Sequence, residues 1–238
     1  MSSLVLVALL AAPPPADEIL RRAQSAVLGE TAVYNLRMTV SRPGKNERVV
    51  EMKGWKKGDD LGLVRYTSPP KERGTAYLRN AGSTWLYLPS AEKVVRVGAK
   101  QNFGGGDFSN ADIFRLSLVN DYVPTLVGEE TWEGQPCYRL DLKAKDRTVA
   151  YDRVVYRVRS DGTFFPLHAE YYTISGRRLK WLTLAEVGRL GSRARPTRLT
   201  MESALEEGSR TVLRFLSIDD GVTLDDRMFT PSALERGE

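Results

Sequence analysis

Apolar and polar residues alternate with a period of two through most of this chain, and turn signals interrupt the alternation about every ten residues. Residues 31–70 predict three antiparallel strands, and residues 74–98 predict three more. Further strands are predicted at residues 122–131, 135–145, 151–160, 164–175, 178–188, 195–206 and 210–217. Because the alternating strand and helix units of a parallel sheet are missing, successive hairpins in one large antiparallel sheet are the expected architecture.

The two faces of these strands differ in polarity. Alternation assigns the following side chains to the apolar face: Tyr34, Leu36, Met38, Val40, Trp85, Tyr87, Tyr138, Leu140, Leu142, Phe165, Leu167, Ala169, Tyr171, Leu179 and Trp181. An apolar sheet face needs a second sheet or helices to cover it, and the sequence provides few helices. The sheet is therefore expected to curl, either around a filled core or around a hollow closed by a lid.

The N-terminal region predicts an export signal followed by a helix. The run from Leu4 to Ala12 is apolar and shorter than the roughly 20 residues that span a bilayer. We therefore interpret residues 1–16 as a signal peptide and residues 17–238 as one domain. The segment "ADEILRRAQSAVLG" then places its apolar residues at helical spacing and stops at Gly29.

The stretch "QNFGGGDFSNADIF" allows three interpretations: an anion cradle, a hinge or a plain loop. It lacks the lysine and hydroxyl of a phosphate loop, which disfavours the cradle. Gly104, Gly105 and Gly106 permit backbone angles closed to other residues, which favours a hinge. A helix with an apolar stripe is predicted from Ser109 to Asn120, and the stripe comprises Ile113, Phe114, Leu116, Leu118 and Val119.

Residue types for catalysis and metal binding are scarce. His168 is the single histidine and Cys137 the single cysteine, so no zinc site or intramolecular disulfide is expected. The aspartate pairs at residues 59–60, 219–220 and 225–226 stand in turn-like stretches. The net charge of +5 comes from basic residues scattered among acids, and the aromatic residues fall mostly on the face opposite the charges. We expect no enzyme activity, no cofactor, no metal and no nucleic-acid partner.

Four short motifs follow one another as they do in a known family: Arg73-Gly74-Thr75, Trp85 to Pro89, Val94 to Arg96, and Gly106 to Ser109. On these motifs the chain resembles the outer-membrane lipoprotein-sorting protein family, the LolA-like periplasmic lipoprotein carriers. The resemblance implies a mainly β fold of the α+β kind, in which one curled antiparallel sheet forms an unclosed barrel. About two or three short helices would cover it as a lid, and acyl chains would lie in the hollow.

The sequence also departs from the family pattern. Family members have an Arg-Pro pair after a W-x-K strand, and its arginine helps to hold the lid shut. Here Trp55 is followed by Lys56, Lys57, Gly58 and Asp59, so the resemblance supplies no lid mechanism.

Combining alternation with the resemblance gives a set of candidate residues. The predicted cavity lining is Met38, Val64, Tyr66, Trp85, Tyr87, Leu140 and Trp181. The predicted lid and hinge residues are Gly104, Gly105, Gly106, Phe108, Ile113 and Phe114.

The expected protein is a periplasmic monomer that carries lipoprotein acyl chains or another lipid towards the outer membrane. It would contact membranes transiently and exchange cargo with an inner-membrane transporter and an outer-membrane acceptor. The alternative is an envelope sensor or an exporter-accessory module of the same fold that recognises acyl groups or a partner protein.

Overall fold

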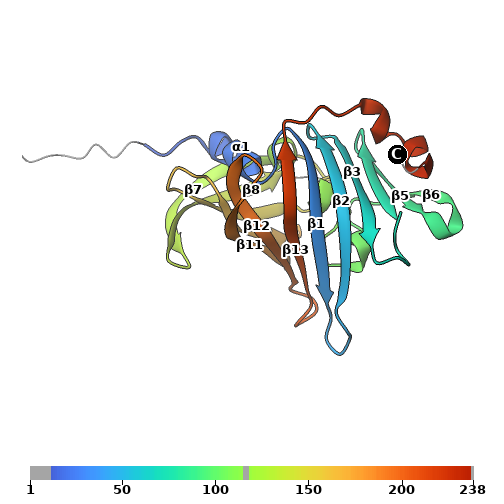
Figure 1. Cartoon of the computed structure of the whole chain (residues 1–238). Helices are drawn as coiled ribbons and strands as arrows, with labels where there is room; N and C mark the ends of the chain where they lie inside the picture. Colours follow the sequence, from blue (N-terminus) through green and yellow to red (C-terminus); the bar gives the residue numbers. More distant parts are fainter. Residues whose placement is uncertain (1–11, 115–117, 237–238) are drawn as a thin grey trace, which may run out of the picture.

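The computed structural model describes residues 12–114 and 118–236, and thirteen strands of this part form one antiparallel sheet. The predicted fold class is confirmed, since the sheet is curled and its two edge strands do not pair with each other (Figure 1). The strands are β1 (Thr31–Ser41), β2 (Arg48–Lys57), β3 (Leu61–Ser68), β4 (Ala76–Asn80), β5 (Ser83–Leu88), β6 (Lys93–Val97), β7 (Tyr122–Trp132), β8 (Gln135–Ala144), β9 (Arg153–Arg159), β10 (Pro166–Tyr172), β11 (Arg178–Leu190), β12 (Arg193–Ser203) and β13 (Arg210–Asp220).

The strand order places the chain's first and last strands side by side. It runs β6-β5-β4-β3-β2-β1-β13-β12-β11-β10-β9-β8-β7, so β1 pairs with β13 in the middle of the sheet. The edges are β6 and β7, which are consecutive in sequence. The chain must therefore cross from one edge of the open barrel to the other between residues 97 and 122, and this crossing carries the segment predicted to be the lid.

Short helices lie around the sheet. They are the α-helices α1 (Ala16–Val27), α2 (Asn110–Phe114), α3 (Leu118–Asp121) and α4 (Pro231–Arg236), and the 3-10 helices η1 (Pro89–Ala91), η2 (Phe103–Gly105) and η3 (Asp226–Phe229). The single helix predicted from Ser109 to Asn120 is thus described as α2 and α3, and the predicted stripe residue Leu116 lies outside the described residues. Residues 1–11 of the predicted signal peptide also lie outside them.

Helix α1 packs its apolar side against the inner face of the sheet. Ile19, Leu20, Ala23 and Val27 are buried there, as the helical spacing predicted. The end of α1 is anchored by Arg195 of β12, which has no exposed surface and donates to the Val27 carbonyl oxygen at 3.0 Å. The same guanidinium pairs with the Asp220 carboxylate. This contact holds α1 against the β12 and β13 side of the barrel.

The outer face of β3, β4 and β5 carries a second, smaller core. Leu63 and Leu78 pack there against Phe229 and Leu234 of the C-terminal segment. Trp85 and Tyr87 belong to this second core, whereas Leu86 between them packs on the inner side. This corrects the predicted faces of β5, because period-two alternation gives two faces without saying which one is inside. The C-terminal segment lies beside β3 and β5 in Figure 1, and its side chains cover the face that carries Trp85 and Tyr87.

Trp181 also lies on the outer face. The register between β10 and β11 shifts between Tyr171 and Tyr172, so that Tyr171 pairs with Lys180 while Tyr172 pairs with Arg178. The shift changes the face of each residue that follows it. Trp181 therefore points away from the interior and donates its indole N–H to Glu202 at 2.8 Å.

Candidate functional site

An apolar cavity of about 100 Å³ lies between the inner face of the sheet and helices α1, α2 and α3. Leucine, valine, phenylalanine and tyrosine side chains make up most of its wall. The residues that line it are Gln24, Val27, Leu28, Tyr34, Leu36, Val64, Phe108, Ala111, Asp112, Ile113, Leu118, Asp121, Tyr122, Ala150, Tyr151, Tyr156, Tyr171, Leu182, Leu184, Leu199, Leu213 and Phe215.

The structure brings only part of the predicted site to this cavity. Val64 of the predicted lining and Phe108 and Ile113 of the predicted lid line it directly. Met38, Tyr66, Leu140 and Phe114 are buried in the same inner core without lining the cavity. Trp85, Tyr87 and Trp181 lie on the outer face.

Sequence reasoning missed the walls formed by β9, β12 and β13. Leu199 and Leu213 line the cavity, and the alternation of "RLTM" and "TVLRF" was sufficient to place both on one face. Tyr122 and Tyr151 carried no such signal, because they stand at the ends of irregular segments.

Helix α2 is fastened to the barrel by one carboxylate, that of Asp112. Lys180 of β11 donates its Nζ to Asp112 Oδ2 at 2.5 Å, and the Tyr151 hydroxyl donates to Asp112 Oδ1 at 3.0 Å. Ser109 adds its backbone N–H at 2.6 Å and its hydroxyl at 2.9 Å. The Lys180 and Asp112 side chains are 11% and 5% exposed, so this ion pair is little screened by water.

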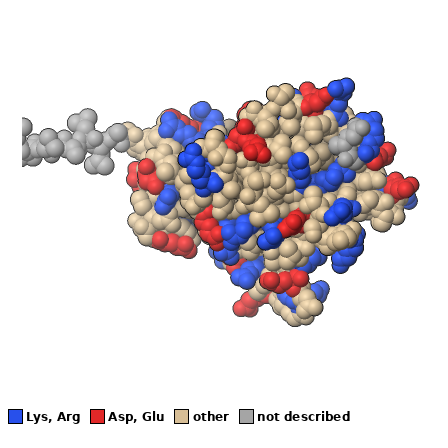
Figure 2. Space-filling model, viewed as in Figure 1, with Lys and Arg blue, Asp and Glu red and all other residues tan. Residues whose placement is uncertain are grey.

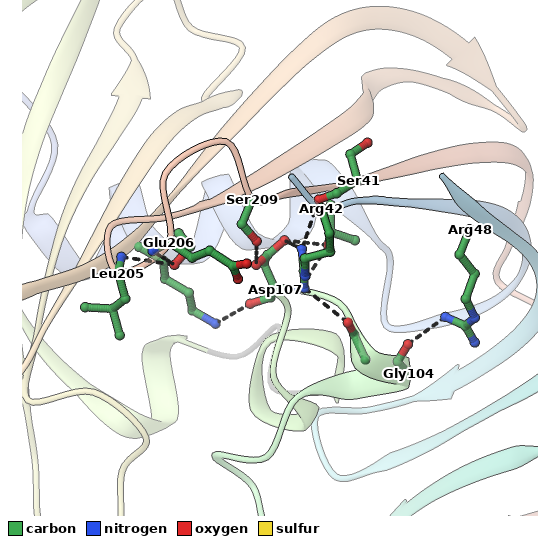
Figure 3. Close-up of polar contacts among 12 residues, drawn as sticks. Ser41, Arg42, Arg48, Gly104, Asp107, Leu205, Glu206 and Ser209 are labelled. Carbon is green, nitrogen blue, oxygen red and sulfur yellow. Dashed lines mark hydrogen bonds and ion pairs between the residues drawn. The ribbon is translucent and has the colours of Figure 1, made fainter. Parts of the chain in front are cut away.

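A second carboxylate, Asp107, fastens the loop that precedes α2. Arg42 donates to it at 2.8 Å, the Ser209 hydroxyl at 2.8 Å and the Thr211 hydroxyl at 2.7 Å. Figure 3 shows Arg42 and Ser209 both reaching Asp107. Lys180 also donates to the Asp107 backbone oxygen at 2.9 Å, so one lysine joins the two carboxylate sites.

Gly104 and Gly105, two of the three predicted hinge residues, form a turn that side chains of the sheet hold in place. Gly104 and Gly105 have φ values of +54° and +70°, a region that glycine enters without the cost that a Cβ imposes. Their carbonyl oxygens accept from Arg48 at 2.7 Å and from Arg42 at 3.1 Å (Figure 3). The turn geometry therefore favours glycine at positions 104 and 105, whereas Gly106 has an extended backbone with φ −88°. Motion of this turn together with α2 would break the contacts with Arg48 and Arg42.

Tyrosine hydroxyls give the apolar wall a polar component. Burial raises the pKa of Tyr34, Tyr156 and Tyr171, so all three remain neutral phenols over the physiological range. Burial and the nearby Asp112 carboxylate raise the pKa of Tyr151 as well. Lysine, arginine and histidine are absent from the described residues that line the cavity.

The cavity is small for a lipid. Pockets that hold drug-sized ligands measure about 300–1,000 Å³, and an apolar cavity of about 150 Å³ suffices for benzene. At about 100 Å³ this space fits no complete acyl chain. The conformation is therefore closed, and a larger ligand enters only if α1, α2 or α3 moves.

Other kinds of site find little support in the described part of the chain. Groups of three or more histidine, cysteine or acidic side chains placed to hold a metal are not found there. Within the same residues, no helix has the length and apolarity to cross a membrane. On the face in Figure 2, lysine and arginine side chains are interspersed with acidic ones and with uncharged surface.

Comparison with known proteins places the chain in a family. A family model described as "Uncharacterized protein" matches residues 58–236. A LolA superfamily protein from Nitrosomonas europaea is 30% identical, with a TM-score of 0.83, and the match covers 93% of this chain and 100% of that one. No curated protein matches the sequence. The chain belongs to the LolA superfamily, which confirms the resemblance drawn from its motifs.

Two further solved structures share the fold. A DUF1329 family protein from Desulfovibrio piger is 28% identical with a TM-score of 0.82, covering 93% of this chain and 100% of that one. A Vibrio parahaemolyticus protein described as an outer membrane lipoprotein-sorting protein domain is 23% identical with a TM-score of 0.79. That match covers 93% of this chain and 98% of the other.

Proposed function

We propose that this protein is a periplasmic carrier that binds acyl chains of a lipoprotein or another lipid in its cavity and moves them towards the outer membrane. The observation that carries the proposal is the apolar cavity lined by the inner face of the sheet and three helices. The non-enzymatic role agrees with the scarcity of catalytic residue types in the sequence. Membership of the LolA superfamily also supports a carrier role.

Burial of an acyl chain supplies the driving force for binding. Each methylene removed from water contributes about 0.8 kcal/mol, so a chain of about a dozen methylenes gains on the order of 10 kcal/mol. Ordering the chain and opening the closed helices offset part of this gain. A carrier needs these opposing costs, because an acyl chain bound with the full free energy of its burial would not dissociate to an acceptor.

The polar contacts of α2 contribute to the free energy that opening the helices costs. Opening breaks the contacts of Asp112 with Lys180 and Tyr151, and water replaces them. The closed state is thus stabilised by a few charged hydrogen bonds in addition to the burial of Phe108, Ala111 and Phe114 in the inner core. Such bonds can be exchanged for hydration at moderate cost, which allows loading and release.

The cellular location and the partners of the proposed carrier follow from the same role. The apolar run before α1 is the feature that supports export, and an inner-membrane donor and an outer-membrane acceptor are the partners such a carrier requires. Membrane contact would be transient, with the protein working as a monomer.

A binding titration with 1-N-phenylnaphthylamine, an uncharged fluorescent apolar probe, tests the proposal. The wild-type chain should bind the probe, and Ala150→Trp should reduce binding at least tenfold because the indole fills the cavity that Ala150 lines. Val123→Trp is the matched control, since Val123 is 53% exposed on the edge strand β7. Thermal unfolding of each variant checks that it folds.

Two results would contradict the carrier. One is a wild-type protein that does not bind the probe or any acyl lipid. The other is an Ala150→Trp variant that folds and binds the probe as the wild type does, because the bound molecule would then lie elsewhere. A stable complex with a partner protein and without lipid would favour a sensor or an exporter-accessory module.

A further inference from the structure

Strand β10 is shorter than its neighbour β11 and leaves one end of β11 unpaired on that side. β10 has 7 residues and β11 has 13, and their pairing ends at His168 and Thr183. Beyond this point, residues 185–190 of β11 pair only with β12. Within the described residues, no strand pairs with the other side of this segment. We call residues 185–190 the β11 edge.

A proline explains why β10 does not continue beside β11. Pro166, the first residue of β10, has no N–H to donate, and the register against β9 shifts between Pro166 and His168. Such a shift bends a strand. The chain before Pro166 turns back to β9, where the Phe165 carbonyl oxygen accepts from the Arg159 N–H at 2.9 Å. The sheet is therefore open beside the β11 edge.

The β11 edge presents backbone groups that can pair with a further strand. Val187 pairs with Pro196 of β12, which has no N–H, so the two residues cannot exchange two hydrogen bonds. In the other kind of antiparallel pair, both residues direct their N–H and C=O groups away from each other. The backbone groups of Val187, and of Arg189 two residues further along, therefore point away from β12. An extended polypeptide supplies donors and acceptors at the same two-residue spacing.

A second cavity, of about 200 Å³, adjoins the β11 edge. Ala185 and Val187 line it, and Trp132 and Arg159 belong to the wall on the side of β7 and β9. An apolar cavity of about 150 Å³ holds benzene, so this space has room for one apolar side chain. Since Val187 is 52% exposed, an apolar side chain placed there would also cover exposed apolar surface.

The charge at the β11 edge indicates the composition of the partner. Glu186 is shared by Arg198 and Arg214, which leaves one positive charge in excess. Arg189 adds another, since it forms no ion pair with any residue that the structure describes. Acidic side chains would be attracted to this surface, and basic ones would be repelled.

We propose that the β11 edge binds an extended, acidic segment of a partner protein, which adds a strand beside Val187 and Arg189 and places one apolar side chain next to Ala185. The wall that includes Trp132 and Arg159 faces the edge, so the space suits a single extended segment better than the edge of a second sheet. The inference goes beyond the proposed function, because it does not depend on a ligand in the inner cavity.

Selection of random peptides on the full chain tests this. A phage-displayed library of peptides of about twelve residues should yield binders that alternate apolar with other residues and carry acidic side chains. Hydrogen exchange then locates the bound peptide. The amides of Val187 and Arg189 should exchange about tenfold more slowly or less in the complex, while the amides of the edge strands β6 and β7 stay unchanged. A library without binders, or binders that protect β6 or β7 instead, would overturn the inference.

Methylation of the peptide backbone shows whether the peptide binds as a strand. Only every second N–H of an added strand donates to the neighbouring edge. Methylating this alternate set of nitrogens should weaken binding about tenfold or more, whereas methylating the other set should change the affinity by less than about twofold. Equal effects of the two sets would show that no strand is added.

Ala185→Trp tests the location, because the indole would fill the cavity beside the β11 edge. Affinity for the selected peptide should fall about tenfold or more, and unchanged affinity in a folded variant would contradict the proposal. Ala204→Trp is the matched control, since Ala204 is exposed in the turn between β12 and β13. Thermal unfolding checks both variants, and if Ala185→Trp does not fold, hydrogen exchange and methylation still decide. A wild-type dimer that the selected peptide dissociates would assign the β11 edge to a second copy of this chain and overturn the partner protein.

Discussion

The ion pair between Lys180 and Asp112 should control how fast ligands enter, and Lys180→Met tests this. The pair joins α2 to β11 at 2.5 Å, and both side chains are nearly buried. Removing one partner of a buried pair costs about 3–5 kcal/mol. The lower end applies here, because Asp112 keeps its contacts with Tyr151 and Ser109.

A loss of about 3 kcal/mol in the closed state raises the open fraction by about two orders of magnitude, because each 1.4 kcal/mol is a factor of ten. If α2 must open before binding, the association rate of 1-N-phenylnaphthylamine should rise by up to about 100-fold in Lys180→Met. Stopped-flow fluorescence measures that rate directly. Lys143→Met removes an exposed lysine from β8 and should leave the rate unchanged.

A double variant sharpens the interpretation. Lys180→Met combined with Asp112→Asn leaves no unpaired charge, so its rate should return most of the way to wild type. The reasoning is refuted if Lys180→Met lowers the melting temperature while its association rate stays within twofold of wild type. The pair would then stabilise the core without holding α2 closed.

Other predictions concern stability. Gly104→Ala should lower the free energy of urea unfolding by about 3 kcal/mol, because alanine would have to adopt the left-handed conformation and its Cβ would overlap the Tyr66 hydroxyl. Gly82 has the same kind of backbone conformation but open space around it, so Gly82→Ala should cost about 1 kcal/mol. Arg195→Met should cost about 3–5 kcal/mol in the same assay, and a cost below 1 kcal/mol would refute its anchoring role. Burial lowers the pKa of His168 to about 4, so the unfolded chain binds the extra proton and stability should fall as pH drops from about 6.5 to about 4. His168→Gln should flatten this part of the melting-temperature profile, and an unchanged slope would show that another group titrates.

Much of the fold could be predicted from the sequence because hairpins are local. The turn at Ala81 and Gly82 and the alternation around it define β4 and β5, and the structure confirms both. The pairing of β1 with β13 is not local, and no pattern in either strand specifies it. The sequence therefore did not predict this pairing.

The candidate site could be predicted only in part, for two physical reasons. Alternation gives the period of a strand but not its inner side, so Val64 was placed correctly and Trp85 was not. The fastening of α2 depends on Lys180, which is far from Asp112 in sequence and is unremarkable as a charged residue in a strand. Only the folded structure, in which the curled sheet brings β11 next to α2, reveals such a contact.

The central claim is that this protein holds an acyl lipid inside its barrel. Native mass spectrometry of the protein, purified gently from its own envelope, measures this directly. The account predicts a bound species with the mass of an acyl lipid or lipoprotein in the wild type, and its loss in Ala150→Trp. A wild-type protein that carries no lipid or lipoprotein, and binds none when offered, would contradict the account.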